Sequence, residues 1–267
     1  MIARAARARR RWDLWVPFAF FLLAFLPAFF SSETPGTIAP ERAWQAPSAQ
    51  HWLGCGEGGI DLLPLVSAAL VRGVALAVSV ALTGFVIGTP LGALAAFSRG
   101  YFERAVLRVA DLLQAFPSFL LALCLLSAVR SPSRVHLYVV FSLTAWAPYA
   151  RFAIAETRVL RSAAFVEAGR AMGLTTARIV QRHILPNLLP IAAVQLGASA
   201  AATLVSEAAL SFVGLGPTGG ITLGSVLDQG VVSMLRSPHV LLVGALSIAL
   251  PAHTLLRVSL GLSKVRT

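Results

Sequence analysis

Charged side chains are scarce in this chain of 267 residues. Asp, Glu, Lys and Arg make up 12% of the sequence and hydrophobic residues 57%, whereas a soluble domain usually contains about 25% charged residues. The apolar residues also gather into long runs that contain no charge. This composition excludes an ordinary soluble domain and predicts a protein embedded in a membrane.

Residues and motifs that commonly carry enzyme chemistry are also few. The two cysteines, Cys55 and Cys124, have neither metal-binding nor redox spacing, so we expect no role for either. The five histidines show no H-E-x-x-H pattern, and the sequence contains no G-x-x-x-x-G-K-S/T phosphate loop. The sequence therefore predicts no catalytic residue, no metal site and no cofactor bound by this chain.

Six uncharged stretches predict transmembrane helices. A spanning helix needs about 20 residues, within a range of about 17–25, and five of the stretches are this long. The fourth is shorter, but it can extend through Arg151 to Ala155. We therefore predict an all-α polytopic membrane protein with six transmembrane helices, over 14–30, 73–98, 112–129, 135–150, 183–206 and 237–256.

The basic residues predict the orientation of these helices. If the N-terminus is cytoplasmic, seventeen of the 22 Lys and Arg lie on the cytoplasmic side, which satisfies the positive-inside rule. The predicted topology is N-in/C-in. The same asymmetry accounts for the net charge of +11, which would otherwise suggest nucleic-acid binding, so we expect no nucleic-acid partner.

The chain divides into four segments under this topology. Residues 1–30 form a basic cytoplasmic tail and a first transmembrane helix, which we expect to be retained because the residues after it make a poor signal-peptidase site. Residues 31–65 form an outer loop. Residues 66–262 form a core of five helices with a long cytoplasmic loop over 158–186, and residues 263–267 form a cytoplasmic tail.

The first half of the cytoplasmic loop predicts a short helix. Ser162 is placed to cap its start, and an apolar stripe follows at positions i, i+3 and i+7. That stripe consists of Phe165, Ala168 and Met172. Gly173 suits the position just after the helix, where a positive φ is needed.

The second half of the loop predicts another short helix. Thr176 is placed to cap it, Ala177 to Leu185 form it, and Pro186 is placed to end it before the fifth span. We therefore expect a rigid helix–turn–helix on the cytoplasmic side.

The same loop resembles the EAA motif, the cytoplasmic coupling loop of ABC importer permeases. Glu167, Ala168, Gly173 and the pair Leu185-Pro186 fall on the spacing of that motif, and a glycine replaces its second alanine. The resemblance implies a type I ABC importer-like permease fold and a loop that inserts into a cleft of a separate ATPase subunit. It assigns this coupling role to Phe165, Glu167, Ala168, Gly169, Arg170, Met172, Gly173, Leu174, His183, Leu185 and Pro186.

Further motifs are similar to one branch of that family, the second (C-type) permeases of dipeptide, oligopeptide and nickel importers. They include Arg182-His-Ile-Leu-Pro-Asn187 and the segment 207–216, whereas the outer segments 54–61 and 217–224 depart from the branch. The resemblance implies a bacterial inner-membrane protein, surrounded by lipid, whose cargo is a peptide, nickel or a metal chelate. The implied partners are a second homologous permease, two ATP-binding subunits that hold ATP and Mg²⁺, and an extracytoplasmic substrate-binding protein.

Two ionisable residues lie in or beside the predicted spans, and such residues commonly mark a pathway or gate. We expect Asp111 to pair with Arg108 at a helix boundary, and Glu207 to anchor the turn after the fifth span or to help gate the pathway. The alternative classes are an ion-coupled secondary transporter and an intramembrane enzyme. The first would need buried carboxylates or unwound half-helices near the midplane, and no predicted span has an ionisable residue at its centre. The second would need paired catalytic groups at facing depth, whereas the histidines are scattered over both ends of the spans.

Overall fold

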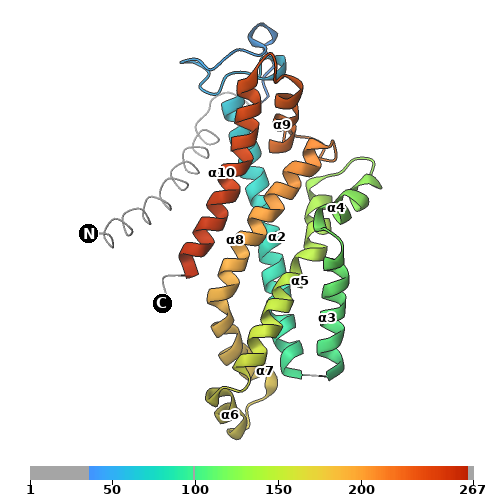
Figure 1. Ribbon diagram of the computed structural model, residues 1–267, viewed down its shortest axis with the longest axis vertical. Helices are drawn as coiled ribbons and strands as arrows, with labels where there is room; N and C mark the ends of the chain where they lie inside the picture. Colours follow the sequence, from blue (N-terminus) through green and yellow to red (C-terminus); the bar gives the residue numbers. More distant parts are fainter. Residues whose placement is uncertain (1–35, 99, 264–267) are drawn as a thin grey trace, which may run out of the picture.

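The chain folds into a long bundle of helices (Figure 1). The computed structural model describes residues 36–98 and 100–263. Within these ranges the only strand-like pairing is an isolated bridge between Cys55 and Asp61. The elements in chain order are η1 (Pro40–Arg42), η2 (Glu57–Gly59), α2 (Leu62–Ser98), α3 (Gly100–Ala115), α4 (Ser118–Ser127), α5 (Arg134–Leu160), α6 (Ala164–Ala171), α7 (Thr176–Ile179), the π-helical turn η3 (Val180–Ile184), α8 (Leu185–Phe212), α9 (Leu223–Val232) and α10 (Pro238–Ser263).

Four helices in the described part of the chain are long and apolar enough to cross a membrane: α2, α5, α10 and the continuous helix Thr176–Phe212. The pair α3 and α4 makes a fifth if the two are counted as one bent span. The all-helical membrane fold is thus confirmed. The predicted helix over 14–30 lies outside the described residues, so the count of six and the N-in/C-in orientation stay predictions.

The hydrophobic run over 112–129, predicted as one transmembrane helix, is divided between two helices. The chain leaves α3 at Phe116 and Pro117, and α4 then runs at 74° to α3 (Figure 1). Proline lacks the N–H that a helix needs, and it pushes the residue before it out of the helical conformation. The hydrophobic run is therefore continuous in sequence but broken in space.

The contact between α2 and α5 forms the centre of the bundle. Gly84, Gly88 and Gly92 follow one another along α2 at intervals of about one turn, and backbone carbonyl groups of α5 lie against them. A Cβ atom at Gly88 would lie 2.3 Å from the carbonyl oxygen of Trp146, and one at Gly92 would lie 2.3 Å from that of Ala150. Small residues of this kind let helices approach closely in lipid.

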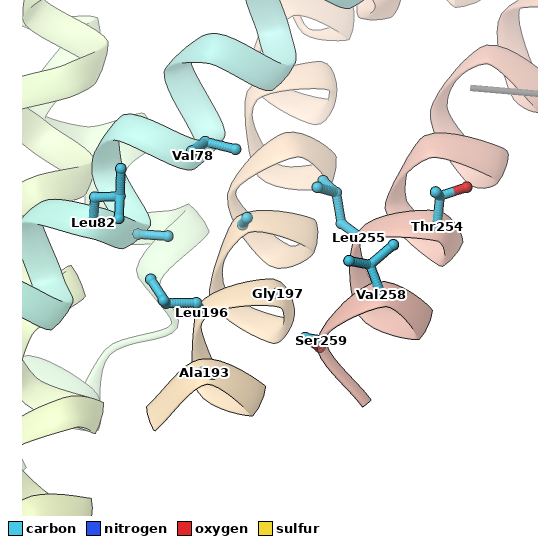
Figure 2. A pocket seen from close by; sticks show the side chains of 11 residues that line it. Val78, Leu82, Ala193, Leu196, Gly197, Thr254, Leu255, Val258 and Ser259 are labelled. Carbon is cyan, nitrogen blue, oxygen red and sulfur yellow. The ribbon is translucent and has the colours of Figure 1, made fainter. Parts of the chain in front are cut away.

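α8 packs against both α2 and α10, and between these three helices lies a groove of about 360 Å³ (Figure 2). The hydroxyl groups of Thr254 and Ser259 in its wall each donate to a backbone carbonyl of their own helix, at 2.8 Å in both cases. We call it the apolar groove. Its lining includes Val78, Leu82, Leu196, Leu255 and Val258.

Candidate coupling site

Residues 164–179 form a compact helix–turn–helix at the end of the bundle where α2 and α3 meet (Figure 1). α6 ends at Ala171, and Gly173, two residues later, has a φ of +76°. The N–H of Gly173 donates to the carbonyl of Arg170 at 2.9 Å, and the N–H of Leu174 donates to that of Gly169 at 3.0 Å. This pair of bonds is the Schellman arrangement that closes a helix on a left-handed residue. Gly173 therefore has the positive φ that the sequence predicts.

Both predicted helix caps in this loop are wrong by one residue. Ser162 does not cap α6, because its Oγ donates to the carbonyl of Val159 at 2.9 Å and Ala163 takes the N-cap position without a side-chain bond. The second helix is capped by Thr175, not by Thr176. The hydroxyl of Thr175 accepts the backbone N–H three residues later at 3.4 Å.

Pro186 does not end the second helix either. Over η3 the backbone changes to the wider π-helical pattern, in which the N–H of Leu185 donates to the carbonyl of Val180. Pro186 then lies in the first turn of α8, directly after the π-helical turn, and does not interrupt the helix. The helix therefore runs from Thr176 to Phe212 and joins the loop directly to a membrane span.

Two side chains fix the loop to the end of α2. Arg161 Nη1 donates to the carbonyl oxygen of Ala96 at 3.1 Å, and the guanidinium of Arg170 lies over the Phe97 ring, 4.9 Å from its centroid. Sequence reasoning missed Arg161 and Phe97 because each contact joins residues far apart in the chain. Beneath them lies an apolar cluster of Ala93, Ala153, Val166, Ile179, Val180, Ile184 and Leu188.

The buried face of α6 consists of Val166 and Gly169, and its predicted apolar stripe is instead exposed. Phe165 is 39% exposed and Met172 is 72% exposed, and Ala168 also faces outward. Exposed apolar residues on a rigid element are typical of protein contact sites.

Two other predicted coupling residues lie beside this stripe. The Phe165 ring stacks on His183, with centroids 6.3 Å apart and planes 22° apart. Glu167 is exposed and makes no ion pair with another described residue. A carboxylate and an apolar stripe are thus presented together on the outward face of α6.

Asp111 pairs with Arg151, so the predicted pairing with Arg108 is wrong. Arg151 Nη1 lies 2.9 Å from Asp111 Oδ1, and a second pair, Arg158 with Glu103 at 2.7 Å, lies about two turns away. Because α3 runs antiparallel to α5, the arginines of α5 reach the acidic residues of α3. The sequence alone did not reveal that these two helices are neighbours.

Glu207 is buried in α8, at 4% exposure, close to the segment that follows the helix. Ser211 Oγ donates to its Oε1 at 3.5 Å. Arg72 and Arg134 line the same small cavity, and Arg72 Nη2 donates to the carbonyl of Ile221 at 2.9 Å. Sequence reasoning missed this pair of arginines. Anchoring or gating by Glu207 stays a prediction.

The fold combines a broken membrane span, a close-packed helical core and a helix–turn–helix joined to a span. A family model described as "Binding-protein-dependent transport system inner membrane component" matches residues 88–260. The chain belongs to this family. It is a multi-pass inner-membrane protein and a permease subunit of an ABC importer, and the family consists of transporter subunits rather than catalytic enzymes.

Curated relatives and a solved structure agree with this assignment. The chain is 30% identical over 211 residues to the glutathione transport system permease protein GsiD of Pectobacterium atrosepticum, covering 79% of this chain and 70% of the relative. It is 31% identical over 202 residues to the dipeptide transport system permease protein DppC of Alkalihalophilus pseudofirmus, covering 74% and 65%. An inward-facing structure of the MetNI methionine ABC transporter aligns with a TM-score of 0.60 and 21% identity, over 76% of this chain and 98% of that one. The likeness to MetNI shows the fold alone.

Proposed function

We propose that this chain is the C-type permease subunit of an ATP-driven importer of short peptides, and that its loop 158–186 receives the motion of the ATPases. It spans the membrane six times with both termini in the cytoplasm. It works with a second homologous permease, two ATP-binding subunits and an extracytoplasmic binding protein. ATP and Mg²⁺ bind to the ATPases, and this chain binds no cofactor. Relatives named for glutathione and dipeptide transport support the peptide class.

One observation carries the coupling role: α6 is exposed on one face and locked to two membrane helices on the other. Its outward face presents Phe165, Glu167 and Met172. Its inner face packs through Val166 and Gly169, and Arg170 of α6 lies over Phe97 of α2. Arg161, at the end of α5, bonds the carbonyl of Ala96 in α2 at the base of the loop. The helix Thr176–Phe212 continues from the loop into the membrane.

This arrangement transmits displacement because the loop contacts the end of α2 through Arg161 and Arg170 and continues into α8 without a break in the helix. A partner that moves the exposed face of α6 also moves the ends of α2 and α8. These helices belong to the close-packed core, in which backbones touch and little sliding is tolerated. Movement of the loop is therefore converted into tilting of membrane helices rather than lost in a flexible connection.

Reconstitution of the complete importer tests this function. We expect dipeptide uptake into proteoliposomes only when both permeases, the ATPases, the binding protein and ATP are present. Glu167→Lys reverses the charge on the outward face of α6 and should lower dipeptide uptake without lowering the amount of protein in the membrane. Glu41→Lys, at an exposed position in the outer loop, is the matched charge reversal and should leave the coupling between ATP hydrolysis and uptake unchanged.

Two results would contradict the proposal. Transport by this subunit alone, driven by an ion gradient without ATPases, would make it a secondary transporter. Uptake of a nickel chelate without uptake of any dipeptide would show that the cargo is not a peptide, although transport would still be driven by ATP.

A further inference from the structure

A second groove, of about 370 Å³, lies where the break between α3 and α4 faces α5 and α8. We call it the polar groove because neutral polar side chains form much of its wall. Phe116 and Pro117, the two residues of the break, also line it. Its polar lining includes Gln114, Ser118, Thr144, Gln195, Ser199 and Ser206.

The polar groove and the apolar groove of Figure 2 are alike in size and different in chemistry. In the apolar groove, Thr254 and Ser259 have hydrogen bonds within their own helices, so hydrocarbon can cover its wall. In the polar groove, the amides of Gln114 and Gln195 bond no side chain or backbone group in the described part of the chain. Each amide has two N–H donors and an accepting oxygen. Covering them with lipid would leave all of these groups unsatisfied.

The backbone also indicates that the polar groove, unlike the apolar groove, does not face lipid. A broken helix at membrane depth is tolerated where the freed backbone groups meet protein or water, and not where they face lipid. The break at Phe116 and Pro117 opens on the polar groove. Side chains and backbone therefore both require a polar occupant on this face.

The polar positions of α8 form a stripe rather than a single point. Gln195, Ser199 and Ser206 follow at intervals of four and seven residues, which keeps them on one face of the helix. At 1.5 Å per residue, the stripe extends for roughly 16 Å along α8. A molecule moving along the helix axis would stay in contact with it.

We infer that the polar groove is one wall of the cargo passage, and that Gln114 and Gln195 hydrogen-bond the backbone amides of a short peptide. The inference rests on the proposed function. A side-chain amide offers a donor and an acceptor, which match the C=O and N–H of a peptide unit. Because the wall is uncharged, it binds the backbone that all peptides share and not a particular side chain. Hydrogen bonds between neutral groups are also individually weak, which permits release.

Accessibility to a charged, water-soluble thiol reagent tests the location. Ala198 lies in the polar groove and Ala193 in the apolar groove, five residues apart on α8 and both half-buried. In the complete complex with Cys55 and Cys124 replaced by alanine, A198C should react and A193C should not. Alanyl-alanine delivered by the binding protein during ATP turnover should slow the reaction of A198C. Equal reactivity at the two positions, or no protection by the dipeptide, would overturn the inference.

Substitution of the amides tests the chemistry. Gln195→Leu and Gln114→Leu keep similar volume and remove the hydrogen bonds, so each should raise the KM for dipeptide uptake by about three- to tenfold. The rise should shrink for a dipeptide whose amide nitrogen is methylated, an effect that a general folding defect does not produce. Thr254→Val in the apolar groove is the control, with uptake unchanged.

The outcomes separate the inference from the proposed function. Normal dipeptide uptake by both glutamine variants, beside an active wild-type complex, would overturn the inference alone. Absence of dipeptide uptake by the wild-type complex would overturn the proposed function and the peptide assignment with it. Protection of A198C by Ni²⁺ in place of the dipeptide would overturn the neutral peptide as the occupant.

Discussion

Arg161, at the base of the coupling loop, donates a hydrogen bond from Nη1 to the carbonyl oxygen of Ala96 at the end of α2, at 3.1 Å. A hydrogen bond from a charged donor to a backbone carbonyl is stronger than one between neutral groups. The bond joins two membrane helices, α2 and α5, at the point where the loop begins. It therefore sets the position from which α6 projects.

Removal of this bond should uncouple transport from ATP hydrolysis. Arg161→Ala deletes an interaction that contributes about 1.5–3 kcal/mol when a charged group takes part, and the loop base then moves relative to α2. We expect the amount of dipeptide carried per ATP to fall at least about threefold, while ATPase activity stimulated by the binding protein persists. Arg104→Ala is the control, because Arg104 bonds the carbonyl of Gly100 within its own helix. Equal effects of the two variants would contradict the prediction.

Substitution at Gly173 should impair uptake through backbone conformation alone. A Cβ at Gly173 would meet no atom within 4 Å, so a larger side chain causes no clash. The φ of +76° is a left-handed conformation, and holding valine in it costs about 1–2 kcal/mol or more of conformational free energy. Uptake should be lost with Gly173→Val and Gly173→Pro and mostly kept with Gly173→Asn, since Asn tolerates this conformation. Immunoblots of membranes check the amount of protein.

Gly100 provides the matched control for this strain. Its φ is +69° and its surroundings are equally open, but it lies at the start of α3, outside the coupling loop. Gly100→Val should therefore leave the dipeptide carried per ATP near the wild-type value. A similar loss of coupling in both variants would show that strain in general, and not the loop turn, is responsible.

Gly88→Ala should destabilise the folded protein. Its Cβ would lie 2.3 Å from a backbone oxygen of α5, and because backbone cannot move aside as a side chain does, the helices must separate, at about 1–3 kcal/mol or more. Thermal unfolding in detergent, followed by size-exclusion chromatography, measures the effect. Gly73→Ala is the control in the same helix, because its nearest neighbour is the flexible end of Leu204 at 3.1 Å. The midpoint temperature of thermal unfolding should fall clearly more for Gly88→Ala than for Gly73→Ala.

The orientation in the membrane is open to a direct test. A reporter that is active only outside the cytoplasm should be active when fused after Glu57 and silent when fused after Arg170, because the basic residues favour a cytoplasmic position for the loop 158–186. The reverse pattern would exclude the N-in/C-in topology and, with it, the contact between α6 and cytoplasmic ATPases.

The sequence predicts the parts of this fold that depend on local chemistry. Uncharged runs identify the long helices because a charge within lipid is costly, and Gly173 identifies the turn because few other residues accept its φ. These features need no knowledge of which segments are neighbours. The caps at Ala163 and Thr175 are missed by one residue because several adjacent Ser, Thr and Ala residues can each begin a helix.

The features that depend on packing were not predictable from one sequence. Asp111 has a basic residue three positions away on its own helix, and only the position of α5 shows that Arg151 is the partner. The polar groove likewise combines residues from four helices. Its signal in the sequence is weak, because Gln114 and Gln195 are uncharged and do not interrupt the hydrophobic runs that identify the spans.

The π-helical turn η3 also preserves the angular phase between the coupling loop and the membrane. Its hydrogen bond spans five residues rather than four, so the turn takes up one more residue than a turn of α-helix in nearly the same rotation. Deleting one residue from Val180–Ile184 would therefore restore regular α-helix and leave α7 and α8 in nearly the same relative orientation. Deleting one residue from the regular α-helix Leu185–Phe212 would instead rotate the segments on its two sides by about 100° relative to each other. The position of a length change along this helix thus determines whether the outward face of α6 keeps its direction.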